Sequence, residues 1–213
     1  MRLARWILGL LVFGTLWIPG AARAQEFTPE QRAALERGEL VRLPLGPSAQ
    51  GSGYVGGTSY VVVDAEPDLV WAAMIDVASY PRMFPRTLSA EVVSDRGSRR
   101  IVRMVQGTSW LAVSFYVLYR LDERARKVSW SLVEDQPHDL ADTRGYWQVE
   151  PWAETRSLVT YVNVTSLGTG PVLALFHDAI QNGLLGVPGN LKAWIEGPNG
   201  ARYREGAATA TNR

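Results

Sequence analysis

The chain has 213 residues, of which 46% are hydrophobic and 20% charged, and its formal net charge at pH 7 is +1. This composition is typical of one globular domain with a substantial hydrophobic core. A nearly neutral chain gives no electrostatic reason to expect a nucleic-acid partner. Because the chain contains no cysteine, disulfides, thiolate metal sites and cysteine nucleophiles are excluded.

The amino terminus has the pattern of a secretory signal peptide. Two arginines precede an apolar run from Trp6 to Ile18, and Ala22-Arg23-Ala24 supplies the small residues of a cleavage site. The apolar run is shorter than the about 20 residues that a membrane-spanning helix needs. We therefore expect residues 1–24 to be a signal peptide and the protein to be exported, periplasmic or secreted, after cleavage near Ala24. An uncleaved anchor is the alternative.

Residues 25–52 are predicted to form a helix and an arm, in which Leu40 to Leu43 form a short strand or an extended segment. Thr28 can cap the helix, and Gln31 completes a capping box. The glycine-rich stretch from Pro44 to Gly57 predicts a loop or a glycine-weakened edge strand. It contains Gly51-Ser52-Gly53-Tyr54-Val55-Gly56, which matches the dinucleotide fingerprint. Since this motif leads into a strand and not into a helix, we do not expect nucleotide binding.

A strand from Tyr60 to Asp64 precedes two short helices. The apolar side of the first helix is predicted to consist of Leu69, Trp71, Ala72, Ile75 and Val77. The second helix lies within Tyr80 to Pro85, because Pro81 and Pro85 prevent a longer one.

Strand periodicity begins at Leu88. The six predicted strands are Leu88–Ser94, Arg100–Gly107, Trp110–Leu121, Lys127–Glu134, Thr143–Glu150 and Leu158–Ser166. The connections between them are short, which favours antiparallel neighbours in a meander. Alternation places Trp130 and Trp147 on the apolar face of their strands.

From Pro171 the apolar residues recur at helical spacing, which predicts a long carboxy-terminal helix. Pro188-Gly189 is expected to kink or restart this helix, whose apolar side continues through Leu191, Trp194 and Ile195. Residues 197–213 are small and polar, and we expect a disordered tail there.

This order of elements predicts an α+β fold. A long antiparallel sheet with one long helix must curve around that helix to bury its apolar face. We expect a six- to seven-stranded sheet, with the two short helices after the first strand closing one end. The space between sheet and helix would form an apolar pocket, with Tyr80 to Pro85 over its mouth.

Several local patterns carry a resemblance to known proteins. They are Val70-Trp71, Asp76, Tyr80-Pro81, Phe84-Pro85, Gly145-Tyr146-Trp147 and Thr160-Tyr161. With the order of elements, they resemble the helix-grip fold of START-type lipid-transfer domains, birch-pollen-allergen-like proteins and the bacterial polyketide cyclase/dehydrase group. The resemblance implies a helix-grip, START-like domain at residues 53–196. Its function stays open, because this fold hosts carriers and enzymes alike.

The candidate ligand-binding residues are those expected to face the pocket. They are Phe115, Trp130, Trp147, Phe176 and Ile180, with Arg103 as a polar anchor. The alternative for the aromatic residues is that they simply fill the core. Arg144 and Asn163 are further candidates for the anchor, and the alternative for both arginines is a solvated position on the convex face.

No catalytic constellation is evident. His138 lies in an acidic turn and is interpreted as a solvated loop residue, whereas His177 lies at the edge of the apolar helix stripe. Neither has a second histidine or a carboxylate at metal-ligand spacing, since Asp178 is expected to point elsewhere. We expect no metal and no cofactor.

The first hypothesis is therefore non-catalytic binding or transport of a lipid or isoprenoid-like molecule in an internal cavity. The second is a cyclase/dehydratase-type enzyme that uses His177, Arg103 or Arg144, at least two of which would have to converge in the cavity. Export argues mildly against it, because acyl-carrier-bound intermediates are cytoplasmic. A third is an interaction module with a filled cavity. We expect a hydrophobic small molecule as partner and a monomer, and we leave open a transient membrane contact.

Overall fold

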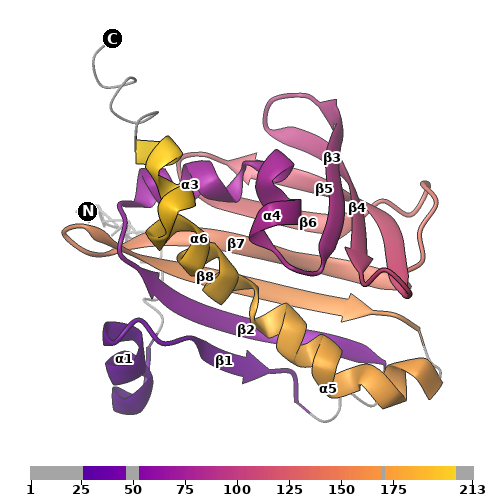
Figure 1. Ribbon diagram of the computed structural model, residues 1–213, viewed down its shortest axis with the longest axis horizontal. Coiled ribbons are helices and arrows are strands. Elements are labelled where there is room, and N and C mark those ends of the chain that lie inside the picture. The colour runs from indigo at the N-terminus through magenta and orange to yellow at the C-terminus, as the bar shows by residue number, and fades with distance from the viewer. Residues whose placement is uncertain (1–25, 47–52, 169–170, 205–213) are drawn as a thin grey trace, which may run out of the picture.

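The computed structural model describes residues 26–46, 53–168 and 171–204, without the side chains of residues 171–175 (Figure 1). The proposed signal peptide lies outside these residues, as does the start of the glycine-rich motif. The helices are α1 (Pro29–Glu36), α3 (Pro67–Met74), η1 (Val77–Ser79), α4 (Tyr80–Met83), α5 (Pro171–Leu185), α6 (Val187–Glu196) and η2 (Pro198–Gly200). The strands are β1 (Val41–Pro44), β2 (Tyr54–Val63), β3 (Thr87–Asp95), β4 (Arg99–Gly107), β5 (Ala112–Asp122), β6 (Lys127–Leu132), β7 (Asp142–Ala153) and β8 (Arg156–Ser166).

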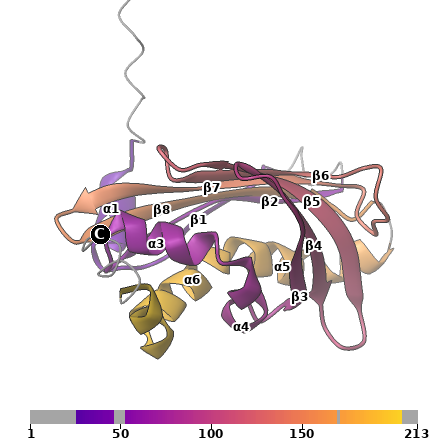
Figure 2. The ribbon, with the colours of Figure 1, turned by 90° about the horizontal axis from the view of Figure 1, so that it is seen from above.

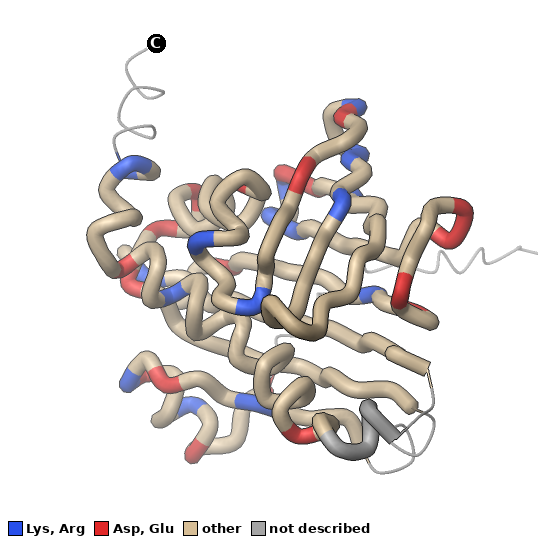
Figure 3. Tube along the Cα trace, turned by 45° about the vertical axis from the view of Figure 1, so that its right-hand side comes forward, with Lys and Arg blue, Asp and Glu red and all other residues tan. Residues whose placement is uncertain are grey.

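The strands form one antiparallel sheet in the order β1-β2-β8-β7-β6-β5-β4-β3. Helices α3, α4, α5 and α6 lie on one face of this sheet, and β3 and β4 bend toward them (Figure 2). The central strands carry few charged residues (Figure 3). Most charged residues of the described chain lie toward the periphery of the molecule. The predicted α+β helix-grip architecture is thus confirmed, although the described sheet has eight strands and not six to seven.

The eighth strand is β1, and the glycine-rich stretch lengthens β2. Strand β2 begins at Tyr54, earlier than predicted, and pairs with both β1 and β8, so it is not an edge strand. Gly56 and Gly57 have φ angles of 120° and 140°. A Cβ on Gly56 would lie 2.0 Å from the Asn163 carbonyl oxygen. Glycine here permits a close approach between strands, which its ordinary role as a loop signal does not indicate.

A second, smaller core explains why β2 is apolar on both sides. Tyr60 and Val62 pack with Leu35 of α1 and with Leu158, whereas Val61 belongs to the main core. Since alternate residues of a strand face opposite sides, α1 covers the convex face of β2 and β8. A continuous apolar run is the pattern of a strand buried on both faces. The predicted capping box of α1 is confirmed.

The buried side of helix α3 agrees only in part with the prediction. Leu69 and the following Val77 are buried as predicted, whereas Trp71, Ala72 and Ile75 are only half-buried. The other buried residues of the helix are Val70, Ala73 and Met74. The helix contacts both the sheet and α6. Its buried side chains therefore point toward two surfaces and do not follow one apolar stripe. Trp71 packs at the margin of the main core.

The predicted long helix is divided in two. Helix α5 ends at Leu185 and α6 begins at Val187, with Pro188 in its first turn, which confirms the predicted restart. Pro lacks a backbone N–H and is tolerated at the start of a helix. No helix among the described residues is long and apolar enough to cross a membrane.

The prediction of a disordered tail from Gly197 is wrong for its first part. Residues 198–200 form η2, and Tyr203 is buried. The Tyr203 hydroxyl donates to Asp76 Oδ2 at 2.8 Å and accepts from Trp194 Nε1 at 3.2 Å, while Arg202 forms an ion pair with Asp76. An aromatic residue and a buried hydrogen bond therefore fix this segment to the end of α3, despite its polar composition.

Candidate functional site

A cavity of about 860 Å³ lies between the concave face of the sheet and helices α4 and α5. Volumes of this size are typical of small-molecule pockets. All five hydrophobic residues predicted to bind a ligand line it: Phe115, Trp130, Trp147, Phe176 and Ile180. Helix α4 contributes Tyr80, followed by Phe84 and Pro85, so the predicted position of this segment beside the cavity also agrees with the structure.

Aromatic rings form a continuous wall of the cavity. The centroid of the Tyr161 ring lies 4.5 Å from that of Trp147 and 5.7 Å from that of Trp130. The ring centroids of Trp130 and Tyr119 are 6.2 Å apart. Trp147 also stacks with Phe84 at 6.2 Å. These residues are buried and belong to the main core. They consequently have both roles considered from the sequence, since they pack against one another and present a surface to the cavity.

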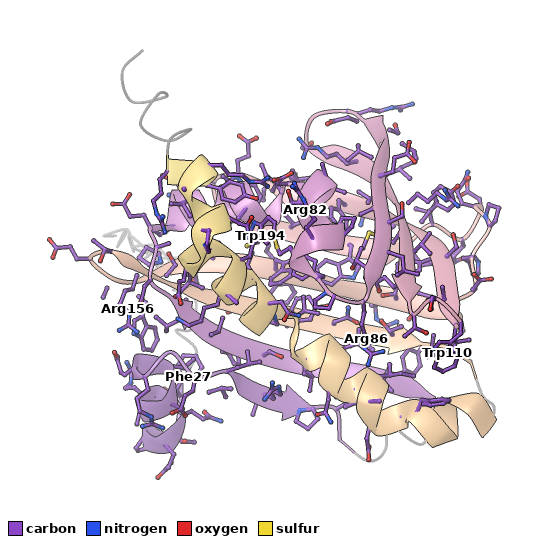
Figure 4. All side chains as sticks on the ribbon, viewed as in Figure 1. Phe27, Arg82, Arg86, Trp110, Arg156 and Trp194 are labelled. Carbon is purple, nitrogen blue, oxygen red and sulfur yellow. The ribbon has the colours of Figure 1, made fainter. Side chains whose placement is uncertain are left out.

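The cavity is bordered on one side by the loop between β4 and β5. Trp110 of this loop is 71% exposed, and its ring lies 6.1 Å from that of Phe176 on α5. Figure 4 shows both Trp110 and Arg86 beside α5, with Arg86 nearer to the carboxyl end of that helix. Leu111 is 46% exposed. An apolar tip of this kind, exposed to solvent beside an apolar cavity, is unusual for a soluble surface.

Four polar side chains lie in the apolar wall, and we call them the polar ladder: Tyr161, Asn163 and Thr165 of β8, and Thr143 of β7. All four are buried. Asn163 Nδ2 donates to the Tyr161 hydroxyl oxygen at 2.8 Å, and Thr165 Oγ1 donates to Asn163 Oδ1 at 2.7 Å. The Thr143 and Thr165 hydroxyls lie 3.0 Å apart. The sequence indicated only Asn163, because the contact with Thr143 depends on strand register.

Three tyrosine hydroxyls lie in or beside the cavity wall. Burial raises the pKa of Tyr119 to about 12, and burial also raises the pKa of Tyr80 and of Tyr161 above the usual value for tyrosine. The Tyr80 hydroxyl donates to the Met74 carbonyl oxygen at 2.6 Å. Because burial disfavours the phenolate, all three stay protonated at neutral pH. They can act as hydrogen-bond groups but not as bases.

Residues 57–196 match the family described as polyketide cyclase / dehydrase and lipid transport. The chain belongs to this family. No curated protein sequence matches the chain.

Solved structures with the same fold span both classes named in the family description. A STAR-related lipid transfer protein from Xanthomonas axonopodis has a TM-score of 0.62 at 15% identity, covering 75% of this chain and 99% of that chain. The Zhui aromatase/cyclase from a Streptomyces species has a TM-score of 0.51 at 17% identity, covering 67% and 96%. A START superfamily protein from Mycobacterium smegmatis has a TM-score of 0.52 at 14% identity, covering 66% and 97%. At these identities the similarity shows the helix-grip fold alone.

The prediction that Arg103 anchors a ligand in the main cavity is wrong. Arg103 is exposed between buried Val102 and Met104 on β4, so the alternation of the strand points it to the opposite face. It lines a small surface pocket together with Tyr116 and His138. The expected alternative, a solvated convex position, is the one observed.

The other candidate for a charged anchor also lies outside. Arg144 is exposed, forms an ion pair with Asp142 and lies over the ring of Tyr54 at 5.4 Å. Its neighbours on β7 lie on the other face of the strand. Thr143 lines the cavity, and the adjoining strands approach the backbone closely at Gly145. Polar character in a strand therefore did not distinguish the inward Asn163 from the outward arginines.

The two histidines do not form a site in this family member. His138 is exposed, as predicted, and its Nδ1 lies 2.7 Å from the Leu140 carbonyl oxygen. His177 is not part of the cavity lining. Asp178 was expected to point away from His177, but its Oδ1 lies 3.1 Å from His177 Nδ1. Adjacent helical residues can pair when one side chain folds back at the helix surface. The described residues contain no cluster of potential metal ligands.

Proposed function

We propose that the protein binds a hydrophobic or amphiphilic small molecule in the cavity between the sheet and α5, as a non-catalytic carrier. The observation that carries the proposal is a cavity of about 860 Å³ lined by aromatic and aliphatic side chains. Affinity would come mainly from burial of apolar ligand surface, which contributes about 25 cal/mol per Å². A ligand that buries about 300 Å² would gain about 7 kcal/mol before the entropic cost of binding.

The cyclase/dehydratase hypothesis has less support. It requires at least two of His177, Arg103 and Arg144 in the cavity, but both arginines lie on exposed surfaces and His177 is outside the cavity lining. The tyrosine hydroxyls that do line the cavity are held in their neutral form. General acid–base catalysis needs groups whose pKa lies near the working pH. Binding is therefore the function that this cavity supports best.

Native mass spectrometry of the protein, purified without organic solvent, tests the proposal. We expect a second mass species, heavier by one small molecule, because an apolar cavity of this volume would retain ligand during purification. Extraction with organic solvent should remove the extra mass and release a neutral or weakly polar molecule. A protein that is always free of ligand, and that takes up nothing from a total lipid extract, would contradict the proposal.

We further propose that the tip of the β4–β5 loop contacts a membrane while ligand is exchanged. The support is the exposure of Trp110 and Leu111 beside the cavity. Tryptophan, whose ring is amphipathic, is enriched at membrane interfaces, and leucine inserts its apolar side chain there. The fluorophore N-phenyl-1-naphthylamine, supplied in phosphatidylcholine vesicles, measures the transfer rate. Trp110→Ser combined with Leu111→Ser should slow transfer at least fivefold, with the equilibrium affinity changed less than threefold.

The matched control is Val93→Ser. Val93 is as exposed as Leu111, at 46%, but it lies on β3 and does not line the cavity. This variant should transfer the fluorophore at the wild-type rate. Equal rates for the loop variant and the wild type would show that exchange proceeds through water.

A further inference from the structure

The hydrogens of the polar ladder have a defined direction. Thr165 donates its single hydroxyl hydrogen to Asn163 Oδ1, so the 3.0 Å contact with Thr143 must be a donation from Thr143 to Thr165. Asn163 in turn donates from Nδ2 to the Tyr161 oxygen. Thr143 therefore donates to Thr165, which donates to the side-chain oxygen of Asn163. The side-chain amide nitrogen of Asn163 donates to the Tyr161 hydroxyl oxygen.

This direction leaves spare donors in the ladder. The Tyr161 hydroxyl accepts from Asn163, and its own hydrogen has no acceptor within the described part of the chain. Asn163 Nδ2 carries a second hydrogen that is likewise unused among those residues. Both groups are buried and line the cavity. A buried donor without an acceptor costs free energy, which a ligand with an acceptor atom would recover.

The charges around the cavity narrow the class of acceptor. The described lining includes two charged side chains, Arg86 and Asp139, and both are exposed. The Asp139 carboxylate already accepts from the Ser114 amide at 2.7 Å. A carboxylate or phosphate brought to the ladder would be desolvated without a cation beside it, which is costly. The acceptor that suits the ladder is therefore uncharged.

We propose that the polar ladder binds a carbonyl oxygen of an uncharged, otherwise apolar ligand, through the Tyr161 hydroxyl and the Asn163 amide. Ketones, quinones and esters belong to this class. The rings of Trp147 and Trp130 both pack against the Tyr161 ring and so restrict the position of its hydroxyl. The inference rests on the proposed function, because it assigns the polar contact within the same cavity.

Two neutral fluorophores separate this inference from the proposed function. Prodan carries a ketone whose emission shifts to longer wavelength when its oxygen accepts a hydrogen bond, whereas N-phenyl-1-naphthylamine has no carbonyl group. Both should bind the wild-type protein. Tyr161→Phe should weaken prodan binding about five- to tenfold, the usual effect of one lost hydrogen bond. Its bound emission should move to shorter wavelength, while the affinity for N-phenyl-1-naphthylamine should change less than twofold.

Two further variants complete the test. Asn163→Leu keeps the side-chain shape but removes the amide hydrogens, and it should also weaken prodan binding selectively. Arg103→Gln removes an exposed cation that lies outside the cavity and should leave both affinities unchanged. Failure of both fluorophores to bind the wild type would contradict the proposed function itself. Binding of both, with Tyr161→Phe and Asn163→Leu equal to the wild type in prodan affinity, would overturn the assignment of the ladder.

Discussion

Replacing Gly145 with alanine is expected to lower the free energy of unfolding by about 3 kcal/mol, the upper part of the range for overpacked cores. A Cβ at this position would lie 2.0 Å from the Val162 carbonyl oxygen and 2.6 Å from Cζ2 of Trp130. The carbonyl belongs to the neighbouring strand β8, so it cannot move without disturbing the sheet. The tryptophan ring is one wall of the cavity and is equally constrained. Glycine is required here for close approach and not for backbone flexibility.

Urea unfolding of the variant and the wild type measures this effect. The matched control is Gly46→Ala, because a Cβ on Gly46 would meet no atom within 4 Å. The control should stay within about 0.5 kcal/mol of the wild type, as is usual for surface substitutions. Equal stability of the two variants would show that Trp130 does not pack on the backbone of β7. It would contradict the position of Trp130 in the cavity wall described above.

Most of the fold could be predicted because its determinants are local. The change from strand to helix periodicity at Pro171 and the short turns between the strands define the order of elements without knowledge of contacts. Trp130 and Trp147 were placed correctly because alternation along one strand decides which face a side chain takes. The hydrophobic wall of the cavity follows directly from that alternation.

The polar part of the site could not be predicted, because it depends on pairing between strands. Thr143 and Thr165 meet through the register of β7 and β8. Alternation from Trp147 places Thr143 on the inward face, but neither strand alone shows that its hydroxyl meets that of Thr165. Arg103 was misplaced for the opposite reason, since the prediction weighed its chemistry above the alternation of β4. A strict reading of the alternation with Val102 and Met104 would have placed it outside.

Long-range packing explains the remaining errors. The segment that contains Tyr203 has few apolar residues, so its composition indicates disorder. It is nevertheless fixed by hydrogen bonds to Asp76, a residue far away in the sequence. Similarly, Gly56 and Gly57 indicate a loop until the close approach of β8 to Gly56 and of β1 to Gly57 is known.

Two tryptophans introduced on the cavity side of α5 are expected to abolish most ligand binding. Ile180 and Leu184 both line the cavity and lie one helical turn apart. Ile180→Trp combined with Leu184→Trp should fill the space between α5 and the sheet and weaken binding of N-phenyl-1-naphthylamine at least tenfold. Because the new rings enter open space and not a packed core, the free energy of unfolding should change by no more than about 1 kcal/mol.

The matched control carries the same two substitutions on the other side of the same helix. Asp178 and Asn182 are exposed and also lie one turn apart. Asp178→Trp combined with Asn182→Trp adds identical aromatic bulk to α5 but does not enter the cavity. It controls for any general effect of two tryptophans on the helix or on the fluorescence of the protein.

Fluorescence titration of these two variants and the wild type tests the central claim, that ligand binds inside the cavity, most directly. We predict saturable binding of one N-phenyl-1-naphthylamine per chain to the wild type and to the Asp178/Asn182 variant, and at least tenfold weaker binding to the Ile180/Leu184 variant. Equal affinities for the two variants, or no saturable binding to the wild type, would contradict it.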